Sequence, residues 1–300
     1  MVLETQWDGD ADGLIVETAI SIANTGKSVV VASDDTDVFI MLLKHVNTTM
    51  ADVFYTTFMR DCKSATTKTV PMWWRVQSVV TMLPIPSDLI LLVHAWGGCD
   101  TTSATYGKGK MKIMETLKSK NLQETVSCFG NAQATQEEIG SAGNSVMLSI
   151  YNGKSETLTA LRYAEWRMMV LGKKKIKPES LPPTVRAVYF HALRVHLQVC
   201  QWATLNLTCL NPTEWGWKAE NGVLVPVKTD IAAAPDFDLN VIRCSCKTTS
   251  KNTCGTNLCS CRKSGLACVA ACSDCRGTSC NNVSGDKSDV ILDADILDHI

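Results

Sequence analysis

The sequence has no excess of charge of either sign, no long apolar run and no basic leader at its N-terminus. Its 300 residues include 29 Lys and Arg against 30 Asp and Glu, so the chain as a whole is not attracted to nucleic acid or to anionic membranes. The longest apolar run, 89–96, is far below the roughly 18 residues of a membrane span, and His94 interrupts it. The acidic N-terminus does not resemble a signal or transit peptide. We therefore expect a reducing compartment, and any affinity for nucleic acid must be local.

Signature loops of several enzyme classes are missing as well. The sequence has no Walker phosphate loop, no G-x-G-x-x-G motif after a strand and no nucleophile elbow. It therefore gives no support to a kinase, a dinucleotide-dependent dehydrogenase or a serine hydrolase. With 45% apolar and 20% charged residues, the chain is long enough to fold around one sizeable core or two modest ones.

Cysteine, in contrast, is abundant and unevenly distributed. Of the 14 cysteines, five are scattered over the first 243 residues and nine lie between Cys244 and Cys280. In a reducing compartment, nine thiols within 37 residues indicate a metal cluster rather than disulfides. The predicted zinc ligands are Cys244, Cys246, Cys254, Cys259, Cys261, Cys268, Cys272, Cys275 and Cys280.

The number of these thiols favours a zinc cluster with shared ligands. Two tetrahedral zinc ions need eight ligands and three need twelve, so the cysteines fit three ions if three thiolates bridge. The surrounding lysines and arginines would leave the loaded module mildly basic. Such a module has almost no apolar core, and metal binding would supply its folding energy. The alternative is a zinc cap with a purely structural role.

Hydrophobic periodicity predicts an α/β fold for the N-terminal part. Helices that alternate with short apolar strands are typical of a parallel sheet, whose ligands lie at the carboxyl ends of its strands. Gly26 is expected to close the first helix, and Asp35 or Thr36 to cap the second. The first strand contains no polar residue, which predicts burial on both faces. The predicted elements are helices over 10–23 and 38–43 and strands over 29–32, 53–55 and 89–93.

The pattern along the chain divides it into five segments. The second is mostly helical, with its clearest periodicity over 158–170 and 184–199. We expect His191 and His196 to be structural, because their spacing is not that of a shared metal site, and His94 to be a core histidine. The predicted segments are an α/β core over 1–120, a helical extension over 121–205, an irregular Trp- and Pro-rich connector over 206–243, a zinc module over 244–282 and an acidic tail over 283–300.

Aspartates stand where a metal site of an α/β fold would need them. Carboxylates at the ends of several strands form the oxygen-rich pockets that Mg²⁺ or Mn²⁺ prefer, and two such ions can hydrolyse a phosphodiester. Ordinary N-cap and turn aspartates would give the same pattern, so both interpretations stay open. The residues concerned are Asp10, Asp12, Asp34, Asp35, Asp37 and Asp100.

Two blocks of the sequence resemble the flap-endonuclease and related PIN-like 5′-nucleases. In residues 10–45 an acidic-Ala-acidic helix start precedes a strand that ends in D-D-T-D, and residues 94–117 contain G-G-C-D before a Gly-containing turn and helix. The resemblance implies a PIN-like core that is incomplete at its N-terminus, because it covers only the C-terminal part of that core. The implied Mg²⁺ or Mn²⁺ ligands of the catalytic site are Asp10, Asp12, Asp35, Asp37 and Asp100, and the implied DNA-backbone contacts are Gly107, Lys108, Gly109 and Lys110.

The cysteine-rich segment resembles the CXC domain of the tesmin/TSO1 family. The match runs over the whole module and includes the C-S-C-R-K-S-G-L-A-C centre. The resemblance implies a three-zinc module that binds DNA. Leu258 stands where that family often has a DNA-contacting tyrosine, so we expect contacts dominated by phosphates instead of insertion of an aromatic ring. The expected phosphate contacts are Lys247, Lys251, Arg262 and Lys263.

The combination of both blocks is similar to large invertebrate proteins of mobile-element type. It implies a nuclear protein, derived from a transposon, that binds zinc and DNA and has a partial two-metal nuclease core with impaired catalysis. DNA is the implied partner, the implied cofactors are zinc and, in an active core, Mg or Mn, and neither a membrane nor a small-molecule cofactor is implied. The alternative is a non-catalytic regulator that binds DNA or chromatin through its zinc module.

Overall fold

The computed structural model describes residues 11–57, 72–151, 155–171, 180–205, 210–230, 242–249, 252–270 and 272–283. The chain forms two compact units. The first unit comprises Met1–Glu165 and Pro178–Ile231, and the second comprises Trp166–Lys177 and Ala232–Ile300.

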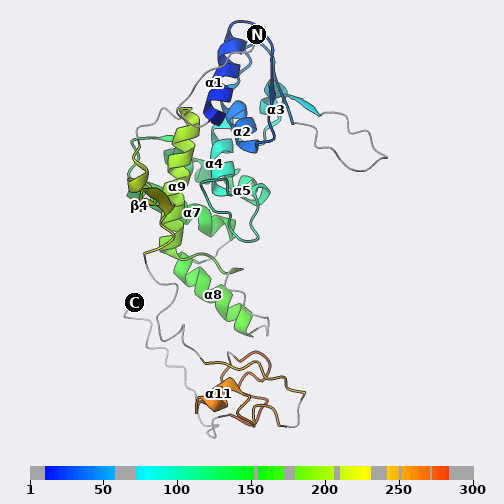
Figure 1. The fold of residues 1–300 in the computed structure, drawn as a ribbon, viewed down its shortest axis with the longest axis vertical. Coiled ribbons are helices and arrows are strands. Elements are labelled where there is room, and N and C mark those ends of the chain that lie inside the picture. The colour runs from blue at the N-terminus through cyan, green and yellow to red at the C-terminus, as the bar shows by residue number, and fades with distance from the viewer. Residues whose placement is uncertain are drawn as a thin grey trace, which may run out of the picture. The chain divides into compact units, whose positions relative to one another are not determined.

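Helices account for most of the secondary structure that Figure 1 shows. The described helices are α1 (Ala11–Asn24), α2 (Thr36–His45), α3 (Val76–Met82), α4 (Ser87–Trp96), α5 (Lys110–Leu117), α6 (Lys120–Val126), α7 (Gln136–Ile150), α8 (Leu158–Leu171), α9 (Val185–Ala203) and α11 (Ser260–Lys263), with 3-10 turns η1 (Ser127–Gly130) and η3 (Pro212–Glu214). The described strands are β1 (Val29–Ala32), β2 (Val53–Thr56), β3 (Trp73–Arg75), β4 (Trp217–Glu220) and β5 (Val223–Pro226). The protein is therefore a mixed α/β protein, rich in helix, with small sheets.

The first helix, strand and helix lie where the sequence predicts them. The chain leaves α1 through Gly26, whose φ of +84° is a left-handed conformation that suits glycine. The N-cap of α2 is Asp35, and its carboxylate accepts a hydrogen bond from the backbone N–H of Asp37 at 2.8 Å. The predicted cap is confirmed.

Strands β1, β2 and β3 form a three-stranded sheet in the order β1-β2-β3. β1 and β2 are parallel, but β2 and β3 are antiparallel, so the sheet is mixed and not parallel as predicted. Val31 is buried, whereas Val30 is 51% exposed. The prediction that this strand is buried on both faces is therefore wrong, because successive side chains point to opposite faces and only the face with Val31 packs against the core.

The segment 89–93, predicted as a strand, lies inside helix α4. Its side chains are apolar around the whole helix, and those from Ile90 to Trp96 are buried, so no polar face reveals a helical period. A short apolar run of this kind cannot be assigned from periodicity alone. Asp100 consequently follows a helix and not a strand. No single described helix is long and apolar enough to cross a membrane, and α3 and α4 reach that composition only as a pair bent by 88°.

The helices over 158–170 and 184–199 are confirmed as α8 and α9. The N-cap of α9 is Thr184, whose hydroxyl accepts from the backbone N–H of Ala187. α7 and α9 approach closely because α7 presents glycines to α9. A Cβ on Gly143 would lie 2.6 Å from the Cβ of Ala192, and one on Gly140 would lie 2.5 Å from the ring of Tyr189.

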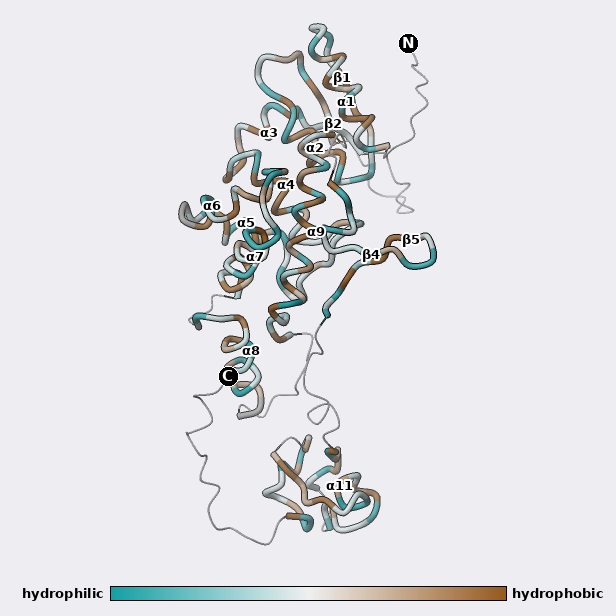
Figure 2. Tube along the Cα trace, turned by 90° about the vertical axis from the view of Figure 1, so that its left-hand side faces the viewer, coloured by the Kyte–Doolittle hydropathy of each residue, from teal (hydrophilic) through white to brown (hydrophobic). Residues whose placement is uncertain are grey.

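The core of the first unit lies among α2, α4, α7 and α9, along which Figure 2 shows interspersed hydrophobic residues. Trp96, Phe129 and Trp202 are its largest fully buried aromatic side chains. His191 and His196 are buried in the same core, as expected. His196 satisfies one ring nitrogen, because its Nδ1 lies 3.1 Å from the carbonyl oxygen of Phe129.

Part of the predicted irregular connector is a regular hairpin. β4 and β5 pair antiparallel around Asn221 and Gly222, both with positive φ, which is the conformation of a tight two-residue hairpin turn. The Asn-Gly pair was the sequence signal for this turn. Trp215, just before the hairpin, is buried with its ring 4.3 Å from that of His196. Residues 206–209 and 231–241 of the connector lie outside the described residues.

Candidate metal centre

The buried side chains of the cysteine-rich module are almost all thiols. Seven of its nine cysteines are buried and two are half-buried. Among the described residues from 242 to 283, Thr253 is the only other buried one. The apolar side chains are turned outward, since Leu258 is 92% and Leu266 48% exposed. The module therefore has a core of sulfur and no core of hydrocarbon.

The backbone of the module brings distant cysteines together through turns. The N–H of Ser273 donates to the carbonyl of Cys244 at 3.0 Å, which joins the start of the module to the loop between Cys272 and Cys275. Gly277 has a φ of +68°, and a Cβ on it would lie 2.4 Å from the carbonyl oxygen of Cys268. A side chain at this position would therefore disturb the loop that carries two neighbouring ligands. This glycine was not singled out from the sequence.

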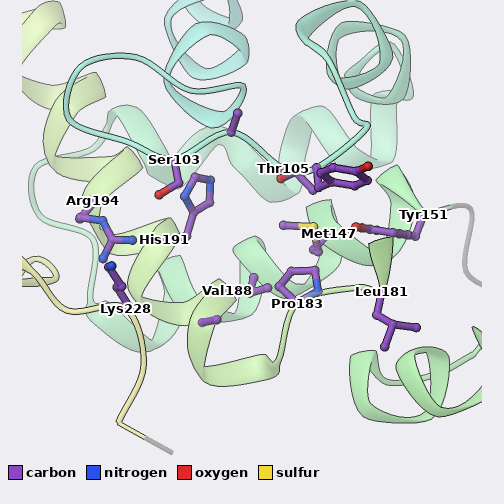
Figure 3. Close-up of a pocket in the computed structure, with 13 residues that line it drawn as sticks. Ser103, Thr105, Met147, Tyr151, Leu181, Pro183, Val188, His191, Arg194 and Lys228 are labelled. Carbon is purple, nitrogen blue, oxygen red and sulfur yellow. The ribbon is translucent and has the colours of Figure 1, made fainter. Parts of the chain in front are cut away.

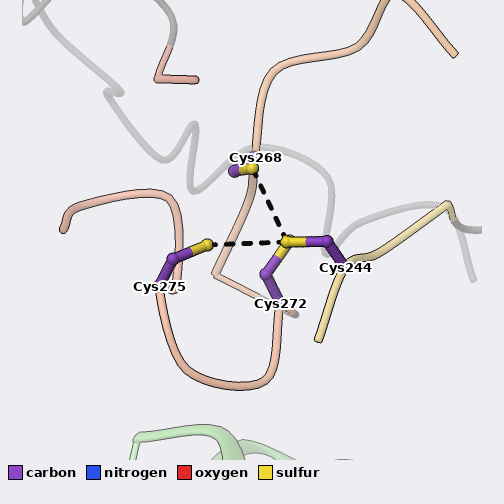
Figure 4. A group of neighbouring side chains, drawn as sticks. All are labelled: Cys244, Cys268, Cys272 and Cys275. Carbon is purple, nitrogen blue, oxygen red and sulfur yellow. Dashed lines mark hydrogen bonds between the residues drawn. The ribbon is translucent and has the colours of Figure 1, made fainter. Parts of the chain in front are cut away.

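The distances between sulfur atoms fit a zinc thiolate site. The Sγ atom of Cys244 lies 3.6 Å from that of Cys254, 3.8 Å from that of Cys268 and 3.7 Å from that of Cys275, as Figure 4 shows for two of these pairs. Four sulfurs at about 2.3 Å from a tetrahedral zinc are about 3.8 Å apart. A disulfide has its sulfurs about 2.05 Å apart, so the spacing excludes disulfides and is compatible with ligands of one metal ion.

The sulfur atoms form three overlapping groups of four, each compact enough for one metal ion. Because Cys244, Cys254, Cys268 and Cys275 each belong to more than one group, the groups are not independent sites. Two predicted ligands lie outside these groups but contact them: the Sγ of Cys261 is 3.6 Å from that of Cys272, and Cys246 hydrogen-bonds with Cys254. The groups are Cys244, Cys268, Cys272 and Cys275; Cys244, Cys254, Cys259 and Cys268; and Cys254, Cys268, Cys275 and Cys280.

The pKa values of these thiols are shifted in both directions. Burial is the main cause that raises the pKa of Cys254 and of Cys268 above the ordinary thiol range, so these two thiols keep their protons at neutral pH without a metal. For Cys259 burial is outweighed by hydrogen bonds from the backbone of Arg262 and from neighbouring thiols, which lower its pKa to about 6. A zinc ion binds the thiolate form and displaces those protons. The cysteines of the module can thus hold zinc, and they would do so with release of protons.

The predicted carboxylate ligands do not form a comparable group. Among the described residues, the only groups of three or more metal-ligating atoms within 4.8 Å of one another are those of the cysteines. Asp35 is exposed and caps α2, Asp12 lies in the first turn of α1, and Asp100 is exposed after α4. Asp10 lies outside the described residues.

Asp37 contacts His94, which in turn contacts Lys110. Its Oδ1 lies 2.7 Å from Nε2 of His94, a buried residue of α4. The Nζ of Lys110 lies 3.1 Å from Nδ1 of the same imidazole. Burial lowers the pKa of Lys110, and the negative charge of Asp37 opposes that change. His94 is thus buried, as expected, and it also links the acidic strand end to α5.

The glycine turn before α5 lies close to this group. Gly107 has a φ of +66°, and Gly109 is the N-cap of α5. The ammonium group of Lys108 lies 4.6 Å from the ring centroid of Tyr151, a cation–π contact. Lys108 and Lys110, both predicted to contact DNA, therefore have contacts within the protein. In the zinc module, Lys247, Arg262 and Lys263 are exposed, and Lys251 lies outside the described residues.

Comparisons with known proteins identify no relative of this chain. No protein-family model matches the chain, and no significant match is found among curated proteins or among solved structures. The resemblances to PIN-like nucleases and to CXC domains therefore remain predictions, and the metal centre rests on the sulfur geometry.

Proposed function

We propose that this protein binds DNA through a module that folds around three zinc ions. The observation that carries the proposal is the sulfur core. Buried thiols with outward-facing leucines give the module no hydrophobic driving force, so the binding energy of metal must supply its stability. Nine ligands satisfy three tetrahedral ions when three thiolates bridge. The three sulfur groups contain seven of the nine cysteines and share four of them, so they support shared ligands in general.

The affinity for DNA is proposed to come from the basic surface of the loaded module. Lys247, Arg262 and Lys263 are exposed, while the chain as a whole is close to neutral. Attraction to phosphates is therefore local to the module. The resemblance to CXC domains and to mobile-element proteins supports DNA as the partner and the nucleus as the place of action.

Elemental analysis of the full chain tests the metal proposal. Three zinc ions per chain are expected. Two ions would mean that the thiolates do not bridge in the proposed way, and a chain that retains no zinc after purification without chelators would contradict the proposal.

The salt dependence of DNA binding tests the contacts. Four phosphate contacts predict that log Kobs falls with log salt with a slope of about −3.6. The double variant Arg262→Gln with Lys263→Gln should reduce that slope by about 1.8, for duplexes of any sequence. The control is Lys27→Gln with Lys218→Gln, two exposed lysines of the first unit, which removes the same charge. An equal change in both double variants would contradict the assignment of DNA contacts to the module.

A metal-dependent nuclease is the second candidate function. Asp34 and Asp35 are exposed directly after β1. Burial raises the pKa of Tyr55 and the charges of Asp35 and Asp34 raise it further, which indicates a negative potential at this strand end. In this proposal Asp35→Ala with Asp37→Ala abolishes Mn²⁺-dependent cleavage of branched or single-stranded DNA and leaves DNA affinity intact. Cleavage that survives both substitutions would refute the site, and an inactive wild type would leave the non-catalytic alternative.

A further inference from the structure

The nine cysteines of the module differ in their exposure to solvent. Seven are buried, whereas Cys246 and Cys280 are half-buried. Cys246 belongs to none of the three groups of sulfur atoms, but Cys280 completes the group that it forms with Cys254, Cys268 and Cys275. All four members of each of the other two groups are buried. Within the described part of the module, only one of the three candidate ion positions therefore has a ligand that solvent can reach.

Cys280 also differs from most grouped cysteines because it belongs to a single group. Four of the seven grouped cysteines belong to more than one group, so their loss from one ion would disturb a second ion. The other three, Cys259, Cys272 and Cys280, belong to one group each. Cys259 and Cys272 are buried, so a competing ligand has to open the module to reach them. Among the described members of the three groups, Cys280 alone is both unshared and accessible.

The loop that carries Cys280 is anchored by the two residues that follow it. The backbone N–H of Asn281 donates to the carbonyl oxygen of Thr253 at 2.8 Å. The carbonyl oxygen of Asn282 accepts from the backbone N–H of Cys268 at 2.6 Å. Both hydrogen bonds use backbone atoms and neither uses the sulfur of Cys280. The loop can therefore keep its place in the module when that sulfur leaves a metal ion.

The rest of the described chain offers no second set of ligands for an ion that leaves this position. In the part that the structure describes, the only groups of three or more metal-ligating atoms are the three cysteine groups. The cavity of the first unit, drawn in Figure 3, has no Cys, Asp or Glu among its described lining residues, and it carries the cations Arg194 and Lys228. An acceptor for the ion therefore has to come from outside the described residues.

We propose that Cys254, Cys268, Cys275 and Cys280 hold an exchangeable zinc ion, whereas the two fully buried groups hold resident ions. This inference rests on the proposed function, because it requires a module with three ions. The acceptor is a chelating ligand with nitrogen or sulfur donors, the atoms that zinc prefers together with oxygen. Its donor atom forms a bond to zinc while the bond from zinc to the Sγ of Cys280 breaks. The released thiolate takes up a proton from solvent, and no electron is transferred.

Zinc release from the full chain, measured after the chain has been reloaded with zinc, tests the proposal. An excess of the chromogenic chelator pyridylazoresorcinol should remove one of the three ions in a fast phase and the other two in a slower phase. Cys280→Ser should bind one ion fewer and lose the fast phase, yet leave the module resistant to proteases because its backbone anchors remain. Cys246→Ser is the matched control, since it removes the other half-buried thiol, and it should keep the fast phase.

Alkylation of the zinc-loaded wild type gives a second readout that needs no variant. A limiting amount of N-ethylmaleimide, followed by peptide mapping, should modify Cys280 before Cys259 and Cys272, because the reactivity of a thiol depends on its exposure. The reverse order would overturn the inference, as would a fast phase that survives Cys280→Ser or that Cys246→Ser abolishes. Three bound ions that leave in a single phase would contradict the exchange alone. A reloaded chain that binds fewer than three ions would contradict the proposed function itself.

Discussion

Acidification should destabilise the first unit, because two histidines are buried in it as neutral rings. Burial lowers the pKa of His191 and of His196 to about 4, against about 6.5 in an unfolded chain. Between these values the unfolded state binds more protons than the folded state, so stability falls as the pH falls. At pH 5 each histidine costs about 2 kcal/mol relative to pH 8, which gives about 4 kcal/mol for the pair. Below pH 4 the loss levels off. His45, whose pKa burial also lowers, adds to the trend.

Urea denaturation between pH 8 and pH 5 measures this loss, with tryptophan fluorescence as the signal because Trp96 and Trp202 are fully buried in the same core. The double variant His191→Asn with His196→Asn should be less stable at pH 8 but should lose most of the slope with pH. Gln201→Asn on the same helix has no titrating group and should keep the slope of the wild type. A wild type whose unfolding free energy stays constant over this range, or a double variant with the original slope, would refute the reasoning.

Further predictions concern the module and the packing of α7 on α9. Cys259→Ser should release zinc and make the module sensitive to proteases, whereas Cys128→Ser outside it should leave the zinc content unchanged; equal zinc in both would contradict the cluster. Gly143→Ala should destabilise the first unit by about 1–3 kcal/mol through overpacking, since its Cβ would lie 2.6 Å from that of Ala192. Ala192→Gly in the same chain should restore part of the loss, and Gly130→Ala, with open space around it, should not destabilise through packing. Chelation of zinc should abolish DNA binding while the fluorescence of the buried tryptophans stays native.

Secondary-structure elements with clear local signals in the sequence could be predicted. The alternation of α1, β1 and α2 could be predicted because each has its own period and Gly26 and Asp35 mark the ends. The strand predicted over 89–93 was wrong because a buried helix and a buried strand share the same apolar composition. The antiparallel addition of β3 could not be predicted either, since it depends on a partner strand distant in sequence. The β4–β5 hairpin could have been predicted, because the Asn221-Gly222 pair is a typical signal for a two-residue turn.

The sequence defined the candidate metal site only in part. Cysteine spacing indicated the candidate metal ligands directly, because the module is short and its loops bring the thiols together. Which thiols overlap, such as Cys268 in all three groups, depends on the folded loops.

Departures from ordinary packing distinguish the two candidate metal sites, the thiols of the module and the carboxylates after β1. A folded chain satisfies its buried polar groups, and the exceptions are concentrated where function imposes them. The module buries thiols in place of hydrocarbon, so it lacks the apolar contacts that ordinarily stabilise a fold. Asp35 and Asp37 need nothing further, because one caps a helix and the other is held by His94. By this criterion the thiols of the module are better candidates for a metal site than the carboxylates are.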